Sequence, residues 1–146
     1  MRATRSFPAS VSSVRAARRF AAGLLGDAAP QVRETAVLIV SELVTNCVRH
    51  AAADFTVVVE VRGSRLRVEV SDGGGGWPVV RHPDRREPAG RGLQIVKALS
   101  DDWGVDHRRD RTTVWFTMRT SARRDVGDRS TRSEPSVRPG RSARTR

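Results

Sequence analysis

The chain has 146 residues, of which 38% are apolar, and a formal net charge of +11. This length suffices for one domain with a hydrophobic core, and the absence of any run of about 18 apolar residues excludes a membrane-spanning helix. The single cysteine, Cys47, excludes an internal disulfide, and because the first ten residues also lack the apolar segment of a signal peptide, we expect a cytoplasmic protein.

Much of the positive charge lies near the C-terminus. Residues 121–146 contain eight arginines and three acidic residues, which gives this segment a net charge of +5. They include no aromatic residue, so the segment cannot bury enough surface to offset the entropy lost on ordering. We therefore predict one domain, residues 1–120, followed by a disordered basic tail, residues 121–146. No nucleic-acid-binding motif accompanies the charge, and no direct nucleic acid partner is expected.

The first part of the chain predicts a short edge strand and two helices. Residues 4–7 have the pattern of the strand. A helix is predicted from Ser10, an N-cap residue type, to Leu25, because apolar residues recur between them at helical spacing. A second and longer helix is predicted from Pro30 to about Ala51.

The second predicted helix carries two polar side chains on one face. Glu42 and Asn46 are four residues apart, so they lie one above the other, opposite an apolar face that includes Cys47. A carboxylate can serve as a base, and a carboxamide oxygen can bind a hard metal ion. Taken alone, the pair is more simply explained as part of a solvated polar face. For Cys47, core packing is the expected role.

Two strands and a glycine-rich segment follow. Apolar and polar residues alternate over residues 57–62 and 65–70, which predicts a hairpin. Asp72 comes directly after the second strand and precedes four glycines, residues 73–76. Glycine lets the backbone approach a ligand closely. Residues 79–89 are polar and are predicted to form a mobile loop.

A third helix is predicted to begin at a Gly-Arg-Gly sequence. Gly90, Arg91 and Gly92 precede a helix from about Leu93 to Ser100. The N–H groups at such a helix start lie at the positive end of the helix dipole and can bind an anion. The only lysine, Lys97, is not part of a Gly-Lys-Ser/Thr sequence, so a P-loop is excluded.

The remaining residues predict a second hairpin. Residues 103–107 and 112–118 are rich in β-branched and aromatic side chains. The strands have one polar face and the helices one apolar stripe. The expected fold is therefore an α/β (α+β) two-layer sandwich, with a mixed, largely antiparallel sheet and helices on one face.

Four segments in this order resemble the sequence boxes of the GHKL superfamily, the ATP-binding domain shared by gyrase B and histidine kinases. SELVTNCVRHA resembles the N box, and VSDGGGGWP resembles the first glycine box, with its Asp-x-Gly-x-Gly pattern. GRGLQIVKALSDDWGV resembles the second glycine box, and TTVWF resembles the last box. The sequence is most similar to the single-domain anti-sigma regulatory factor type of serine/threonine kinase, abundant in actinobacteria, over residues of about 4–119. The resemblance implies the histidine-kinase-type ATPase (Bergerat) fold.

The resemblance also implies roles for residues of the N box and the first glycine box. Glu42 matches the general base of the family, and Asn46 matches the ligand of the Mg²⁺ ion bound to the ATP phosphates. Asp72 would accept a hydrogen bond from the adenine amino group. Gly74 and Gly76 would let the loop pass close to the nucleotide.

The last two boxes imply the remaining contacts with ATP. Gly90, Arg91, Gly92 and Leu93 would surround the phosphates, with Arg91 as a charge stabiliser. The threonine near adenine would be Thr113, with its neighbour Thr112 as the alternative.

The activity that the resemblance implies is that of an ATP- and Mg²⁺-dependent serine/threonine protein kinase acting as an anti-sigma factor. Its partners would be a sigma factor and an anti-sigma-factor antagonist, which it would phosphorylate. Members of the family commonly dimerise, which leaves a homodimer open. Two alternatives also remain: a module that binds ATP and sequesters a partner without phosphoryl transfer, and an ATP hydrolase or histidine-kinase-like fragment.

Overall fold

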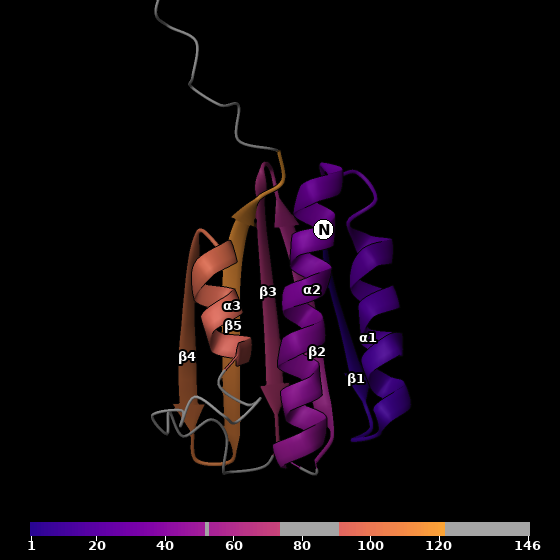
Figure 1. Ribbon diagram of the computed structural model, residues 1–146, viewed down its shortest axis with the longest axis vertical. Helices are drawn as coiled ribbons and strands as arrows, with labels where there is room; N and C mark the ends of the chain where they lie inside the picture. Colours follow the sequence, from indigo (N-terminus) through magenta and orange to yellow (C-terminus); the bar gives the residue numbers. More distant parts are fainter. Residues whose placement is uncertain (52, 74–90, 122–146) are drawn as a thin grey trace, which may run out of the picture.

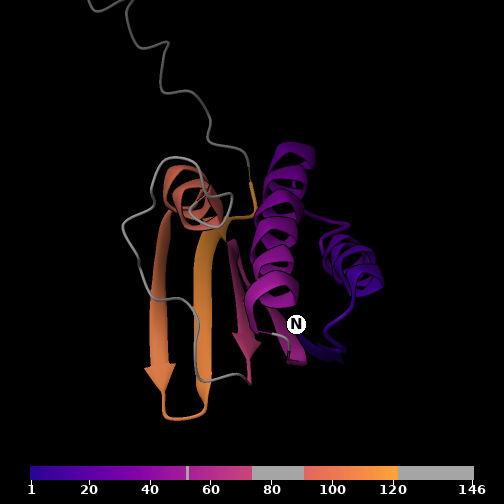
Figure 2. The ribbon, with the colours of Figure 1, turned by 60° about the horizontal axis from the view of Figure 1, so that its bottom comes forward.

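The computed structural model describes residues 1–51, 53–73 and 91–121. Within them, five strands form one antiparallel sheet in the order β1-β2-β3-β5-β4. Three α-helices cover one face of the sheet (Figures 1 and 2). The predicted two-layer fold is confirmed, and every described strand pair is antiparallel.

The helices agree with the predicted pattern to within a few residues. They are α1 (Val11–Leu24), α2 (Pro30–Asn46), a short π-helix η1 (Cys47–Ala51) that continues α2, and α3 (Arg91–Leu99). Ser10 has the extended backbone of an N-cap, but its hydroxyl bonds to the hydroxyls of Ser12 and Ser13 and does not cap the helix N–H groups. None of the described helices has the length and apolar content that a membrane crossing requires.

The strands pair as two hairpins and an added edge strand. They are β1 (Arg2–Phe7), β2 (Phe55–Arg62), β3 (Arg65–Asp72), β4 (Asp102–Arg108) and β5 (Arg111–Arg119). The β2–β3 and β4–β5 pairs are the hairpins predicted from residue alternation. The β3–β5 pairing joins the two hairpins, and it places the end of β3 beside the start of β5.

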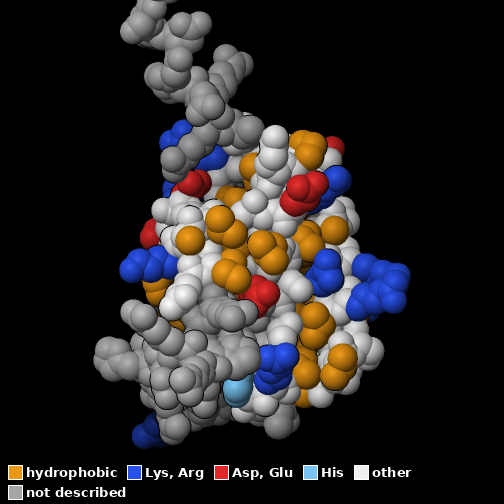
Figure 3. Space-filling view, in the orientation of Figure 1, with side chains coloured by type: hydrophobic (Ala, Val, Ile, Leu, Met, Phe, Trp, Pro, Cys, Tyr) orange, Lys and Arg blue, Asp and Glu red, His pale blue; other side chains and the backbone are white. Residues whose placement is uncertain are grey.

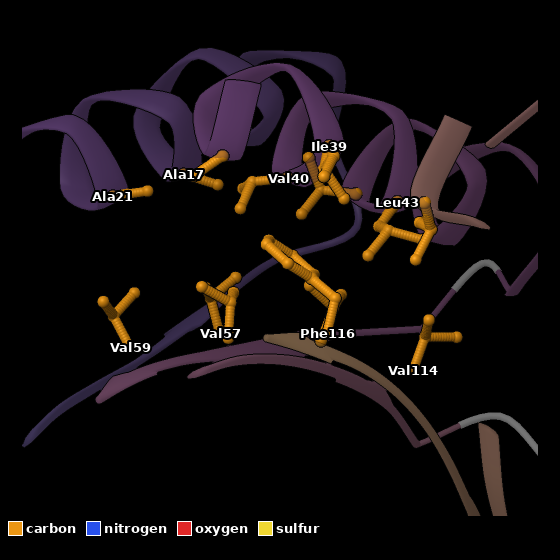
Figure 4. Close-up of a cluster of buried hydrophobic side chains, with 14 of the residues drawn as sticks. Ala17, Ala21, Ile39, Val40, Leu43, Val57, Val59, Val114 and Phe116 are labelled. Carbon is orange, nitrogen blue, oxygen red and sulfur yellow. The ribbon is translucent and has the colours of Figure 1, made fainter. Parts of the chain in front are cut away.

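The core lies between the sheet and the helices (Figure 4). The strands contribute every second residue, as an alternating pattern requires, and Val57, Val59, Val114 and Phe116 point from the sheet toward the helix layer. Figure 4 shows side chains of α1 and α2, including Leu43, meeting them from above. The helices therefore pack on the sheet mainly through apolar side chains.

The face of the sheet away from the helices is polar. The guanidinium of Arg67 lies 4.4 Å from the centroid of the Trp115 ring and pairs with Glu69. Gly104 lies opposite Trp115, and a Cβ at Gly104 would be 2.6 Å from that ring, so no larger residue fits there without displacing it.

Candidate functional site

The polar residues of α2 lie where the helix widens. Asn46 is the last residue of the α-helix, and the π-helix η1 begins at Cys47. Asn46 is only 4% exposed, whereas Glu42, one turn earlier, is half-buried. Single π-helical turns are frequent at functional sites. The predicted pair thus lies at the C-terminal end of α2, with Asn46 deeper than Glu42.

The first turn of α3 packs against this pair. A Cβ at Gly92 would lie 2.5 Å from Asn46 Nδ2 and 3.8 Å from Glu42 Cβ. The first distance is closer than two such atoms can approach, so any larger residue at position 92 would displace the Asn46 side chain. Leu93, the next residue, is half-buried against the core. The structure therefore brings Glu42, Asn46 and the start of α3 together.

The carboxamide of Asn46 has an unused donor. Within the described residues, Asn46 Nδ2 is buried and has no hydrogen-bond partner. Buried polar groups are nearly always paired, so an exception suggests a ligand position. Rotation of the carboxamide about its last torsion would present its oxygen in the same place.

Asp72 lies at the same end of the molecule, beneath the last turn of α2. It is the final residue of β3 and is 1% exposed. Burial, and then the nearby Asp72 carboxylate, raise the pKa of the Cys47 thiol to about 12. That electrostatic contact links the end of β3 to the end of α2. Asp72 is therefore a carboxylate enclosed between the sheet and the helix layer.

The threonine beside Asp72 is Thr112, which the sequence analysis gave as the alternative to Thr113, and the contact of either threonine with adenine stays a prediction. Thr112 is opposite Asp72 in the β3–β5 register and is buried on the same face. Thr113 points to the other face, where its hydroxyl lies 2.7 Å from Ser71 Oγ. Successive residues of a strand face opposite sides, so only one of the two can lie in the site.

One residue of this region was not singled out from the sequence. His107 of β4 has its Nδ1 atom 3.3 Å from Thr112 Oγ1. The signal that could have found it is the hairpin register, which places residue 107 opposite residue 112. Alternation from Val114 and Phe116, both buried, would likewise have favoured Thr112 over Thr113.

Several predicted positions lie outside the described residues. These are Gly74, Gly76 and Gly90, together with the predicted loop 79–89 and most of the predicted tail. Arg91 is described only as the first residue of α3. Their roles stay predictions, as do the roles of the residues that the structure does describe.

The described residues suit a magnesium ion that is held mainly by its nucleotide. Residues 1–51, 53–73 and 91–121 contain no group of three or more His, Cys, Asp or Glu side chains that could hold a metal. Mg²⁺ bound to a nucleotide needs no such group, because phosphates and water supply most of its ligands. The buried Asn46 carboxamide beside the start of α3 fits the remaining position.

Comparison with known proteins gives one family and one fold. Residues 7–118 match the family described as histidine kinase-like ATPase domain. The crystal structure of the RsbU and RsbW domains of Rv1364c from Mycobacterium tuberculosis is similar, with a TM-score of 0.65 and 22% sequence identity. The match covers 82% of this chain and 32% of that chain, so this chain spans about a third of the solved one. At this identity the similarity shows the fold alone. No curated protein matches the sequence.

Proposed function

Since the chain belongs to the histidine kinase-like ATPase family, we propose that its site binds ATP with Mg²⁺ and that the protein is a regulatory serine/threonine kinase acting as an anti-sigma factor. The observation that carries the proposal is the junction at the end of α2. Gly92 of α3 abuts Asn46 there, and Asp72 lies beneath the same turn. The N–H groups at a helix start can bind the phosphates of a nucleotide, and a buried hydrogen-bond acceptor can bind its base.

Asp72 would recognise the base. A carboxylate accepts hydrogen bonds only, and the adenine amino group donates them. Asp72 is buried between the sheet and the helix layer, where few water molecules compete and each hydrogen bond is stronger.

The start of α3 and Asn46 would hold the phosphates. The first N–H groups of α3 have no partner within their own helix and lie at its positive end. Asn46 would contribute its carboxamide oxygen to the magnesium ion. That ion, when bound, neutralises phosphate charge and orients the transferred group.

Glu42 would act as the general base. It lies one turn from Asn46 on the face that meets α3. Within the described residues its carboxylate has no hydrogen bond or ion pair, so it can accept a proton. Glu42 would take that proton from a serine or threonine hydroxyl of the antagonist as the oxygen bonds to the γ-phosphorus and the bond to ADP breaks.

The proposed partners are a sigma factor and the antagonist, as the resemblance to anti-sigma factors implies. Hydrophobic side chains gather in the middle of the helix-bearing face (Figure 3). Leu38 of α2 is 44% exposed and Leu99 of α3 is 42% exposed. Exposed apolar side chains on neighbouring helices support a protein partner on this side of the molecule.

The proposal is tested by titrating ATP and Mg²⁺ into the wild type and two variants. Asp72→Asn should weaken ATP binding by about tenfold or more, because a charged hydrogen bond is lost. Glu42→Gln should bind ATP like the wild type but transfer phosphate to the antagonist about a hundredfold more slowly. Glu34→Gln, an exposed residue two turns earlier on α2, is the matched control and should change neither quantity.

The outcomes separate the alternatives. Equal ATP binding by the wild type and Asp72→Asn would contradict the adenine assignment. Unaltered antagonist phosphorylation by Glu42→Gln would contradict the assigned base. ATP binding without transfer by the wild type would favour the module that sequesters its partner.

A further inference from the structure

A row of side chains crosses the sheet at the end where β3 finishes. The register places Phe55 opposite Asp72, Asp72 opposite Thr112, and Thr112 opposite His107. Opposite residues of neighbouring strands share a face, with Cβ atoms about 4.5–5.5 Å apart. The row therefore runs from an aromatic ring through a carboxylate and a hydroxyl to an imidazole on the edge strand β4.

His107 is the outermost member of the row and contacts its neighbour directly. Its Nδ1 atom lies 3.3 Å from Thr112 Oγ1. It follows Trp103 and Val105 on the face of β4 that packs against the core. His107 is exposed while Thr112 is 3% exposed, so the imidazole lies at the rim and the hydroxyl lies inside.

The imidazole controls what the hydroxyl can offer to a ligand. The Thr112 hydroxyl has one proton to donate and two lone pairs. If Nδ1 of His107 carries no proton, it accepts the hydroxyl proton, and Thr112 can only accept from a ligand. If Nδ1 is protonated, His107 donates to Thr112 Oγ1, and Thr112 keeps its proton for a ligand acceptor.

Building on the proposed ATP site, we propose that His107 is a positioning residue that donates through Nδ1–H to Thr112 Oγ1 and thereby directs the Thr112 proton toward N1 of adenine. Adenine presents an amino donor beside the N1 acceptor on one edge, and proteins read bases through such edges. The Asp72 carboxylate can only accept, so it suits the amino group. Thr112 is the neighbour of Asp72 in the row, and its hydroxyl suits N1 directly or through one water molecule.

The first test is spectroscopic and is run on the free and on the ATP-bound protein. In protein labelled with ¹⁵N-histidine, the chemical shift of Nδ1 reports whether that nitrogen carries a proton. The His107 signal is assigned with His107→Phe. We expect a protonated Nδ1, and we expect Thr112→Val to shift that signal. A bare Nδ1 in both the free and the ATP-bound protein would overturn the inference.

The second test compares ATP with 1-deaza-ATP, which lacks the N1 acceptor. His107→Phe should weaken ATP binding by about fivefold to tenfold, the usual effect of one lost hydrogen bond. His107→Asn, which keeps a donor, should retain most of the affinity. For 1-deaza-ATP, the wild type and His107→Phe should bind equally weakly, because the two changes remove the same interaction.

The matched control is Asp106→Asn. Asp106 is the neighbour of His107 on β4, is exposed, and pairs with Thr113 on the opposite face, so ATP affinity should stay unchanged. If His107→Phe binds ATP like the wild type, the inference is overturned and the ATP site stands. If the wild type binds no ATP, the proposed function fails, and the inference fails with it.

Discussion

At the scale of single residues, Cys47 and Asp72 lie close together at the corner of the molecule that we propose binds the base. Cys47 is fully buried as the first residue of η1, and Asp72 is buried at the end of β3. Burial disfavours the charged thiolate of Cys47, and the negative charge of Asp72 disfavours it further. A second negative charge beside the Asp72 carboxylate is therefore unfavourable in this part of the molecule.

The Cys47 thiol should therefore be inert in the folded protein. Burial and the Asp72 carboxylate raise the pKa of Cys47 from its ordinary value of 9.0 to about 12, and only the thiolate reacts with alkylating agents. At pH 8, iodoacetamide should label Cys47 only after unfolding. Asp72→Asn should lower the pKa of Cys47 and speed labelling of the folded protein at pH 10. Rapid labelling of the native wild type at pH 8 would contradict this.

The same shift in pKa makes stability depend on pH. Above pH 9 the unfolded chain loses the Cys47 proton while the folded chain keeps it, so the free energy of unfolding falls as pH rises from 9 toward 12. The loss between pH 8 and pH 10 should be about 1 kcal/mol. In Cys47→Ala, the loss of unfolding free energy between pH 8 and pH 10 should be smaller by about 1 kcal/mol. Urea titrations at the two pH values measure this difference.

At the scale of secondary structure, the site depends on the contact between the end of α2 and the start of α3. Gly92 lets the two helices meet at Asn46. The π-helical turn η1 begins after Asn46, and the hydroxyl of Thr45, in the last turn of α2, donates to the Ser41 carbonyl oxygen at 2.6 Å. Such side-chain bonds are known to deform helices. The junction is therefore a specialised end of α2.

Gly92→Ala should show whether the contact between α2 and α3 matters more than the helix propensity of residue 92. Alanine favours a helix by about 1 kcal/mol over glycine, but its Cβ would lie 2.5 Å from Asn46 Nδ2 and displace that side chain. We expect ATP affinity to fall by about tenfold or more, with a net loss of stability of about 1–2 kcal/mol. ATP titration and urea unfolding measure the two effects.

Gly23→Ala is the control for this substitution. Gly23 lies in α1, and a Cβ there would meet no atom within 4 Å. This variant should gain about 0.5–1 kcal/mol in stability and bind ATP like the wild type. Wild-type ATP affinity in Gly92→Ala would show that the α2–α3 junction does not contact the nucleotide.

At the scale of the whole molecule, the candidate site occupies one end of a two-layer fold. Both α2 and β3 finish at this end, and α3 and β5 begin there (Figure 1). In both ribbon views, α2 lies between α1 and α3 (Figures 1 and 2). Residues that are far apart in the chain thereby lie close together at the ends of their helices and strands.

Truncation after Thr120 should leave ATP binding unchanged. The Thr120 N–H donates to the Ser64 carbonyl oxygen and the Thr120 carbonyl accepts from the Ala29 N–H, at 2.9 and 3.0 Å, and a chain ending at Thr120 keeps both bonds. We expect the ATP affinity and the melting temperature of the truncated protein to match those of the full chain. A large loss of affinity would show that the predicted domain boundary is too early.

The sequence by itself determined the elements, their buried faces and the order of the boxes. Helix and strand periodicities are local, so the pairing of Glu42 with Asn46 on one face and the glycine at the start of α3 can be read from short stretches. The family membership also followed from box order.

Only the tertiary structure decided which of those residues meet. That Thr112 lies beside Asp72 depends on the register between β3 and β5, which are distant in sequence. That Gly92 abuts Asn46 depends on how two helices pack on one sheet. The β3–β5 pairing and the packing of the helices are set by the fit of the whole core, so local patterns in the sequence do not show which elements meet.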